Sequence, residues 1–331
     1  MNIIFCLSYT NIPYALDIIY RNKNYLVVTS NKRIEEFFKS FFDEKKVIKI
    51  PNLSFEPSFK FPIQLIILYF YKIKIWRHFK RFKNRNVYIF FVAFAFFEGW
   101  LVKKMSFNNK IYLSKAVKVK IYEKRSFYAI LSKKILNIVY NIDVIPNYNG
   151  NRIIYNFTDK FYEDIAAISY PVNKNIHNDF KKKLRRYYNL DSYDIIIFLG
   201  GIVETNYTDR LEYVNKMREI VDLMKNYNSL VKFHPRYKKI FMNENELPSL
   251  SSFIPGNLVL DCFDYVISSH SSVLFEAANK NLTAISLLRF FNPINKALRD
   301  HYINYLNDNL ELNAKIYYPE NLEELKHIIG L

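Results

Sequence analysis

Short apolar runs alternate along the chain with segments whose apolar positions recur at helical spacing. Apolar runs of about four to eight residues are typical of strands buried on both faces of a parallel sheet. In the first half we expect strands at Asn2–Leu7, Tyr25–Thr29, Val47–Ile50, Asn86–Val92 and Lys110–Leu113. Helices are expected from about Pro13 and over Lys32–Phe42. This alternation predicts an α/β fold with helices on both faces of a parallel sheet.

The second half repeats the pattern. Expected strands are Ile195–Leu199, Ser229–Phe233, Leu258–Leu260, Tyr265–Ile267 and Thr283–Leu287, and expected helices are Asp209–Asn226, Ser272–Lys280 and Asn321–Ile329. The polar stretch Asn173–Asp191 contains the charge run Lys181–Arg186, which is typical of a surface connection. We therefore expect two doubly wound, Rossmann-like domains, one over 1–175 and one over 190–331.

One short motif, His234-Pro235-Arg236, closes an apolar run of the second half. Proline ends the hydrogen-bond ladder, which leaves the histidine at the carboxyl edge of the sheet, where such folds hold phosphorylated ligands. There His234 could donate a hydrogen bond to a phosphate or protonate a leaving phosphate, and Arg236 could add charge-assisted contacts. The alternative is a histidine that only caps a loop.

A second motif is the serine cluster between an apolar run and an expected helix, comprising Ser268, Ser269, Ser271 and Ser272. Serine is a good helix N-cap, and hydroxyls beside free backbone N–H groups can bind an anion. Four serines exceed what one cap needs, which favours anion binding over simple capping. Glu276, one turn into the helix, could reach a ribose hydroxyl, or it is an ordinary first-turn acid. His270 is a weaker candidate.

Gly200-Gly201 follows a third apolar run in a chain with only six glycines. Glycine there allows a tight turn or a close approach of the backbone to a ligand. The spacing matches neither GxGxxG nor a P-loop, so the usual dinucleotide and NTPase fingerprints are absent. A simple turn is the alternative reading.

Composition narrows the function classes. A net charge of +17 favours an anionic partner, whether nucleic acid, anionic lipid or a phosphorylated or acidic sugar, over a merely solvated basic surface. The two cysteines are far apart and lie in or beside apolar runs, which is typical of buried thiols in a reducing compartment. No Cys/His spacing predicts a metal site.

The sequence does not predict a transmembrane helix. Phe61–Tyr71 is too short to span a bilayer and Ile89–Val102 contains Glu98, so we expect a cytoplasmic protein.

The segment Tyr71–Arg85 interleaves Lys and Arg with Ile, Trp and Phe. This pattern is typical of a helix that lies on an anionic membrane, which predicts a peripheral association with the inner face of the plasma membrane. A domain helix with a solvated basic face is the alternative. Nucleic-acid binding is disfavoured because no helix-turn-helix, RNP, KH or zinc signature is present.

The HP motif, followed about 35 residues later by Ser271-Ser272-Val-Leu before a helix, resembles bacterial sialyltransferases of glycosyltransferase family 52 and the bacterial polysialyltransferases. The resemblance covers mainly residues 194–290 and implies a GT-B fold with an interdomain cleft. It also implies that His234 and Ser271-Ser272 contact the phosphate of CMP-sialic acid, with no metal required. Pro235, Arg236, Glu276, Gly200 and Gly201 would complete the donor site. Related transferases that use CMP-Kdo or CDP-polyol donors share the HP and serine turns.

The implied reaction moves sialic acid, or a related nonulosonic acid, to a sugar hydroxyl of a surface glycan: lipooligosaccharide, O-antigen or capsule. The family carries an acidic pair followed by glycine, one acid being the general base. Here the only acidic residue before a glycine is Glu98, and none lies near Ser114–Ala116, where the pair would be expected.

Glu98 is therefore the expected base, because burial among aromatic residues would raise its pKa toward working pH. A helix-surface acid is the alternative reading of this residue. Asp143, Asp159 and Glu163 remain open as bases. A basic membrane- or nucleic-acid-binding protein on an α/β scaffold is the non-enzymatic alternative.

Overall fold

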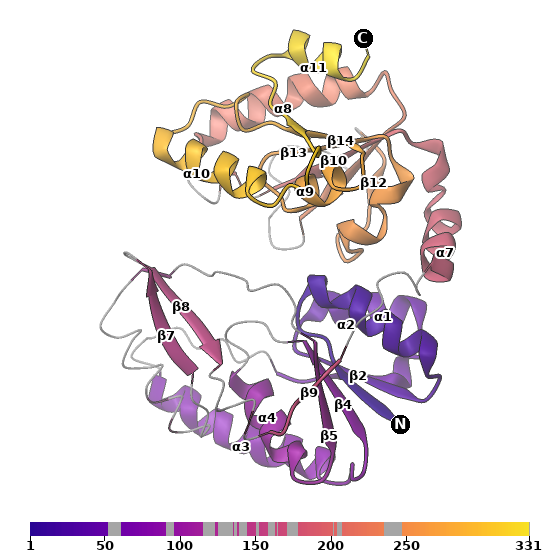
Figure 1. Cartoon of the computed structure of the whole chain (residues 1–331), viewed down its shortest axis with the longest axis vertical. Helices are drawn as coiled ribbons and strands as arrows, with labels where there is room; N and C mark the ends of the chain where they lie inside the picture. The colour runs from indigo at the N-terminus through magenta and orange to yellow at the C-terminus, as the bar shows by residue number, and fades with distance from the viewer. Residues whose placement is uncertain are drawn as a thin grey trace. The chain divides into compact units, whose positions relative to one another are not determined.

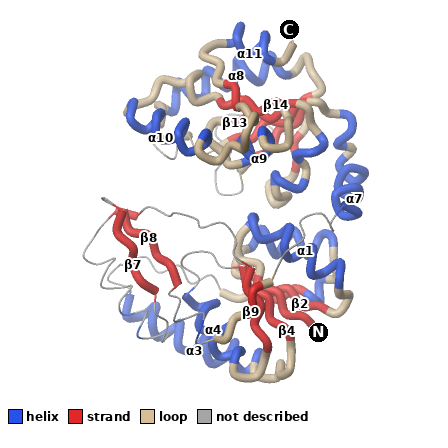
Figure 2. Tube along the Cα trace, viewed as in Figure 1, coloured by secondary structure: helices blue, strands red, loops and turns tan. Residues whose placement is uncertain are grey.

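The structure is a computed structural model. It describes residues 1–51, 61–90, 96–114, 123–124, 135, 138, 144–149, 152–157, 163, 165–170, 178–200, 202–203, 207–234 and 247–330. The chain divides into two units, Met1–His177 and Asn178–Leu331, and each contains a six-stranded parallel sheet (Figures 1 and 2).

The first sheet has the order β3-β2-β1-β4-β5-β9, with every neighbouring pair parallel. Its strands are β1 (Asn2–Phe5), β2 (Tyr25–Thr29), β3 (Val47–Lys49), β4 (Asn86–Phe90), β5 (Lys110–Ser114) and β9 (Ile168–Ser169). The helices are α1 (Ile12–Arg21), α2 (Lys32–Phe41), α3 (Phe61–Phe79) and α4 (Phe96–Ser106), with 3-10 turns at Tyr9–Asn11 and Glu44–Lys46. A small antiparallel sheet comprises β6 (Glu123–Lys124), β7 (Val144–Asn149) and β8 (Arg152–Phe157).

The second sheet has the equivalent order β12-β11-β10-β13-β14-β15. Its strands are β10 (Ile195–Leu199), β11 (Ser229–Phe233), β12 (Ser249–Leu250), β13 (Tyr265–Ser268), β14 (Thr283–Ser286) and β15 (Ile316–Tyr317). Its helices are α7 (Asn178–Tyr188), α8 (Arg210–Met224), α9 (Val273–Ala278), α10 (Lys296–Asn307) and α11 (Leu322–Ile328), with 3-10 turns at Leu190–Ser192, Gly256–Leu258 and Leu260–Cys262. Figure 1 shows α8 and α11 on one face of this sheet and α9 and α10 on the other.

In both sheets the strand order reverses beside the first strand, which is the order of a doubly wound Rossmann-like fold. The predicted fold class, α/β with two such sheets in succession, is confirmed. The central strands form because both of their faces are covered. Ile3, Ile4 and Phe5 of β1, and Ile196 and Ile197 of β10, are completely buried.

Two parts of the second unit differ from the sequence prediction. Leu258–Leu260 is not a strand but joins two 3-10 turns, closed by hydrogen bonds from Val259 N to Gly256 O and from Cys262 N to Val259 O. Pro255 and Gly256, which precede this run, favour local turns, so the run closes locally instead.

The charge run Lys181–Arg186 belongs to helix α7 of the second unit, whose first residue, Asn178, lies within the polar stretch Asn173–Asp191. Phe180 and Leu184, one helical turn apart, are buried, and they dock the helix on its own unit. Lys181 also forms an ion pair with Asp261. The run is therefore the outer face of an amphipathic helix rather than a bare connection.

Candidate functional site

The carboxyl edge of the second sheet brings three sequence motifs together. The strand order reverses at β10, which lies between β11 and β13, and ligands of doubly wound sheets bind at the carboxyl ends beside such a reversal. Leu199 is in register with Phe233, and Phe198 is in register with Ser268. The three strands therefore end nearly level, and the glycine, histidine and serine motifs leave the sheet side by side.

Gly200 leaves β10 with a φ of 131°. This backbone conformation strongly favours glycine, because a Cβ would collide with the neighbouring backbone. The φ value agrees with a tight turn at Gly200, and its partner Gly201 lies outside the described residues.

Replacing Gly200 with alanine should lower the free energy of unfolding by about 1–3 kcal/mol, the usual cost of a strained backbone conformation. Urea denaturation followed by circular dichroism would measure the change. An unfolding free energy equal to that of the wild type would mean that the turn relaxes, and that glycine is not required there.

His234 is placed at the sheet edge by its own backbone. Its N–H donates to Leu199 O at 2.9 Å, which extends the β10–β11 ladder by one residue beyond the last strand position. The side chain is exposed, at the predicted place. Pro235 and Arg236 lie outside the described residues.

The four serines form two pairs with different surroundings. The Ser268 hydroxyl donates to Phe198 O at 3.1 Å, and the Ser286 hydroxyl donates to Ser269 O at 2.6 Å, so the first part of the cluster ties β13 to its neighbours. Ser272 is the N-cap residue of α9, but its hydroxyl makes no capping hydrogen bond. Ser271 Oγ accepts only a long hydrogen bond, 3.5 Å, from Val273 N. Simple capping therefore does not account for Ser271 and Ser272.

The two remaining candidates of this cluster face α10. The His270 ring lies 4.8 Å from the Tyr302 ring, its Nδ1 is 3.1 Å from Ser269 Oγ, and burial lowers its pKa to about 4. It is therefore neutral at physiological pH. Glu276 lies in the first turn of α9. Burial raises the pKa of Tyr305 on α10, and the charge of Glu276 raises it further.

Lys232, two residues before His234 on β11, was not among the site residues predicted from the sequence. Its side chain is only 4 % exposed, and Nζ donates to Ser252 O at 3.4 Å. Among the described residues no carboxylate forms an ion pair with it, and burial lowers its pKa to about 8. Perturbed, buried charges of this kind cluster at functional sites. The available signal was a single lysine inside an otherwise apolar run.

Two relations show that the Lys232 side chain is directed toward the carboxyl edge of the sheet. Residues two apart on a strand point to the same face, so Lys232 and His234 share one face of β11. Lys232 is in register with Leu250 of the parallel strand β12, and Ser252 follows Leu250 by two residues. The ammonium thus reaches forward, toward the carboxyl edge where the histidine stands.

In the first unit Glu98 lies in the first turn of α4, and 8 % of it is exposed. Burial raises its pKa, and a hydrogen bond donated by the Ser30 hydroxyl only partly offsets this. Because Ser30 directly follows β2, Glu98 lies at the carboxyl edge of the first sheet. The alternative of a helix-surface acid is wrong. Of the other acids, Glu163 is exposed, and Asp143 and Asp159 lie outside the described residues.

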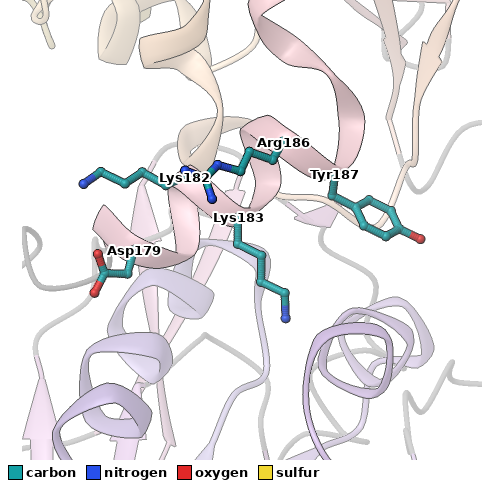
Figure 3. A pocket seen from close by; sticks show the side chains of 5 residues that line it. All are labelled: Asp179, Lys182, Lys183, Arg186 and Tyr187. Carbon is teal, nitrogen blue, oxygen red and sulfur yellow. The ribbon is translucent and has the colours of Figure 1, made fainter.

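A hollow on the second unit is lined by Asp179, Lys182, Lys183, Arg186 and Tyr187. All five belong to the exposed side of α7, and Figure 3 shows their side chains fanning out rather than converging. The hollow therefore lacks the convergent polar groups of a ligand site. Within the described part of the chain, no group of three or more His, Cys, Asp and Glu side chains could hold a metal ion.

No family model and no curated protein matches the chain. Solved structures are similar to it at low identity. The UDP-GlcNAc 2-epimerase of Methanocaldococcus jannaschii is 14 % identical, covering 100 % of this chain and 92 % of that chain at a TM-score of 0.49.

The Neisseria meningitidis UDP-GlcNAc 2-epimerase is 9 % identical, with coverage of 99 % and 98 % and a TM-score of 0.46. The E. coli ADP-heptose lps heptosyltransferase II is 11 % identical, with coverage of 99 % and 98 % and a TM-score of 0.40. The assignment of the fold rests on the two sheets of the chain itself.

Proposed function

We propose that this chain is a glycosyltransferase that moves sialic acid, or a related nonulosonic acid, from a CMP-linked donor to a sugar hydroxyl of a surface glycan. The observation that supports the proposal is that Gly200, Lys232, His234 and Ser271-Ser272 lie on or shortly after three adjacent strands, β10, β11 and β13, of one doubly wound sheet. A cation, an imidazole and two hydroxyls suit one phosphate group.

The reaction explains why these groups would be needed. The bond between the anomeric carbon and the phosphate oxygen breaks, and its electrons leave with CMP, whose phosphate gains one negative charge. The Lys232 ammonium and the serine hydroxyls would stabilise that charge, and His234 would donate a hydrogen bond or a proton to the departing oxygen. Because these groups match a single phosphate, the proposal requires no metal ion.

The acceptor hydroxyl forms the new bond to the anomeric carbon, and its proton must go to a base. Glu98 is our candidate, since a carboxyl whose pKa is raised by burial can take a proton near working pH. A donor of another class, CMP-Kdo or a CDP-polyol, would use the same phosphate contacts. The nucleotide preference therefore has to be measured.

Calorimetric titration should rank CMP above UDP and GDP, and replacing His234 with alanine should weaken CMP binding by about tenfold or more through loss of a charge-assisted hydrogen bond. Replacing both Ser271 and Ser272 with alanine should act in the same direction. His327→Ala, an exposed histidine on α11, is the matched control and should leave the affinity unchanged.

CDP binding tighter than CMP binding would favour a polyol phosphate transferase. If neither nucleotide binds while a polyanion binds tightly, the enzyme proposal fails. Unchanged CMP affinity in the His234 and serine variants would remove these residues from the donor site.

A further inference from the structure

Helix α3 unites two segments that differ in composition, the apolar Phe61–Tyr71 and the first half of the basic Tyr71–Arg85. Its large apolar side chains are unusually exposed. The exposed fractions are 60 % for Ile63, 59 % for Ile66, 47 % for Ile67, 63 % for Tyr69 and 66 % for Phe70. Soluble proteins rarely leave a contiguous patch of this kind on their surface, and such patches mark interaction sites.

Four of these five apolar side chains and two exposed cations follow one face of α3. Ile63, Ile66, Ile67 and Phe70 have the i, i+3, i+4, i+7 spacing of a single helical stripe. The same stripe continues to Lys74 and then to Arg77, which are both exposed. One face of the helix is thus apolar in its first half and cationic in its second.

The opposite face holds α3 on the first unit. Phe79 is completely buried in the core, and Ile75, Trp76 and Phe82 pack against that core. The Lys72 ammonium lies 4.8 Å from the centre of the Trp100 ring of α4, and in Figure 1 the two helices lie on the same side of the first sheet. These contacts fix the rotation of α3, so the exposed stripe is a consequence of the fold.

We propose that the stripe from Ile63 to Arg77 binds the surface of an anionic lipid bilayer. The apolar half would enter the boundary between headgroups and acyl chains, and the cations would contact anionic headgroups. The charges support this partner, since the sequence holds no acidic residue from Pro57 to Phe97. Among the described residues no helix combines the length and apolar character needed to cross a membrane.

Other partners fit this stripe less well. Nucleic acid offers phosphates to Lys74 and Arg77 but no apolar phase for four aliphatic and aromatic side chains. A second copy of the chain offers an apolar partner, but the stripe carries no acid to pair with the cations of that copy. All residues of this stripe belong to α3, and none of them is part of the proposed donor site.

Flotation of the full chain with vesicles tests the proposal. The protein should float with phosphatidylcholine vesicles that contain about a third phosphatidylglycerol, and poorly with phosphatidylcholine alone, and the binding should weaken as salt rises. The Ile66→Gln/Phe70→Gln and Lys74→Gln/Arg77→Gln variants should each lose about tenfold or more in vesicle binding, because each removes one half of the stripe.

The control is Lys182→Gln/Arg186→Gln, which removes two exposed cations from α7 and should float like the wild type. Equal flotation of all three variants would overturn the proposal, because binding would then not depend on the stripe. Net charge alone would explain binding if the two cation variants lost flotation equally and Ile66→Gln/Phe70→Gln floated like the wild type. A dimer in light scattering that Ile66→Gln/Phe70→Gln dissociates would instead assign the stripe to a second copy. CMP affinity without vesicles should not change in any variant, which separates this test from that of the donor site.

Discussion

Replacing Lys232 with methionine is expected to weaken CMP binding by about ten- to a hundredfold while raising the free energy of unfolding. The first effect follows from removing a cation that would contact the donor phosphate, an interaction of about 1.5–3 kcal/mol. The second follows because a buried ammonium with no carboxylate partner among the described residues costs free energy that an apolar side chain of similar length does not.

The pKa of Lys232 sets the size and the pH range of the stability effect. Burial lowers it from 10.5 to about 8, so the unfolded state holds the proton more tightly than the folded state. The unfolding free energy of the wild type should therefore rise as pH increases from about 8 to 10.5, by about 3 kcal/mol at most. The methionine variant should lack this rise.

The same titration predicts how affinity changes with pH. The charged lysine is the form that binds phosphate, so CMP affinity should fall in the wild type above about pH 8 and stay flat in the methionine variant. Urea denaturation and calorimetry between pH 7 and pH 10.5 would measure both quantities. Lys225→Met, at the exposed end of α8, is the control and should change stability by less than about 0.5 kcal/mol.

A Lys232 variant that is stabilised but binds CMP as tightly as the wild type would make the lysine a structural residue. Loss of CMP binding together with loss of stability would indicate general damage. Only the opposite changes, weaker binding and greater stability, mark a charge that is kept for the ligand at the expense of the fold.

The central strands were predictable because their apolar runs are continuous, as burial on both faces requires. The His234 and serine motifs were predictable for a related reason, since a polar residue directly after such a run must lie at the sheet edge. That the strands before these motifs end at the same level could not be predicted from the sequence. It depends on the register between neighbouring strands, such as that of Leu199 with Phe233. The run Leu258–Leu260 failed as a strand because Pro255 and Gly256 favour local turns.

The burial of Lys232 and the exposed stripe of α3 could not be predicted from composition. A lysine within a strand is usually read as facing solvent, and only the register with Leu250 and the contact with Ser252 reveal a buried ammonium directed at the edge. Along α3 the composition changes near Tyr71, which suggested two segments. The helical period continues through that change, and only burial at Phe79 defines which stripe is exposed.

Replacing Glu98 with glutamine is expected to slow sugar transfer by about a hundredfold or more, the usual contribution of a general base, without changing CMP affinity. Glutamine has nearly the same shape, and its carbonyl oxygen can still accept the hydrogen bond from Ser30. The substitution therefore removes the proton acceptor and keeps the contact. Transfer would be measured as CMP release from CMP-sialic acid that depends on an added glycan acceptor, with Glu44→Gln, an exposed acid of the first unit, as the control.

The pH dependence separates a base from a merely buried acid. Since burial raises the pKa of Glu98, the carboxylate should form at a higher pH than that of an ordinary glutamate, and transfer should rise with pH through that range. If Glu98 had only a structural role, the rate of transfer would be nearly unchanged in the glutamine variant. Stability would then increase, because a neutral amide replaces a desolvated carboxylate. Transfer at the wild-type rate would thus remove Glu98 from the reaction and return the search to the other acids of the first unit.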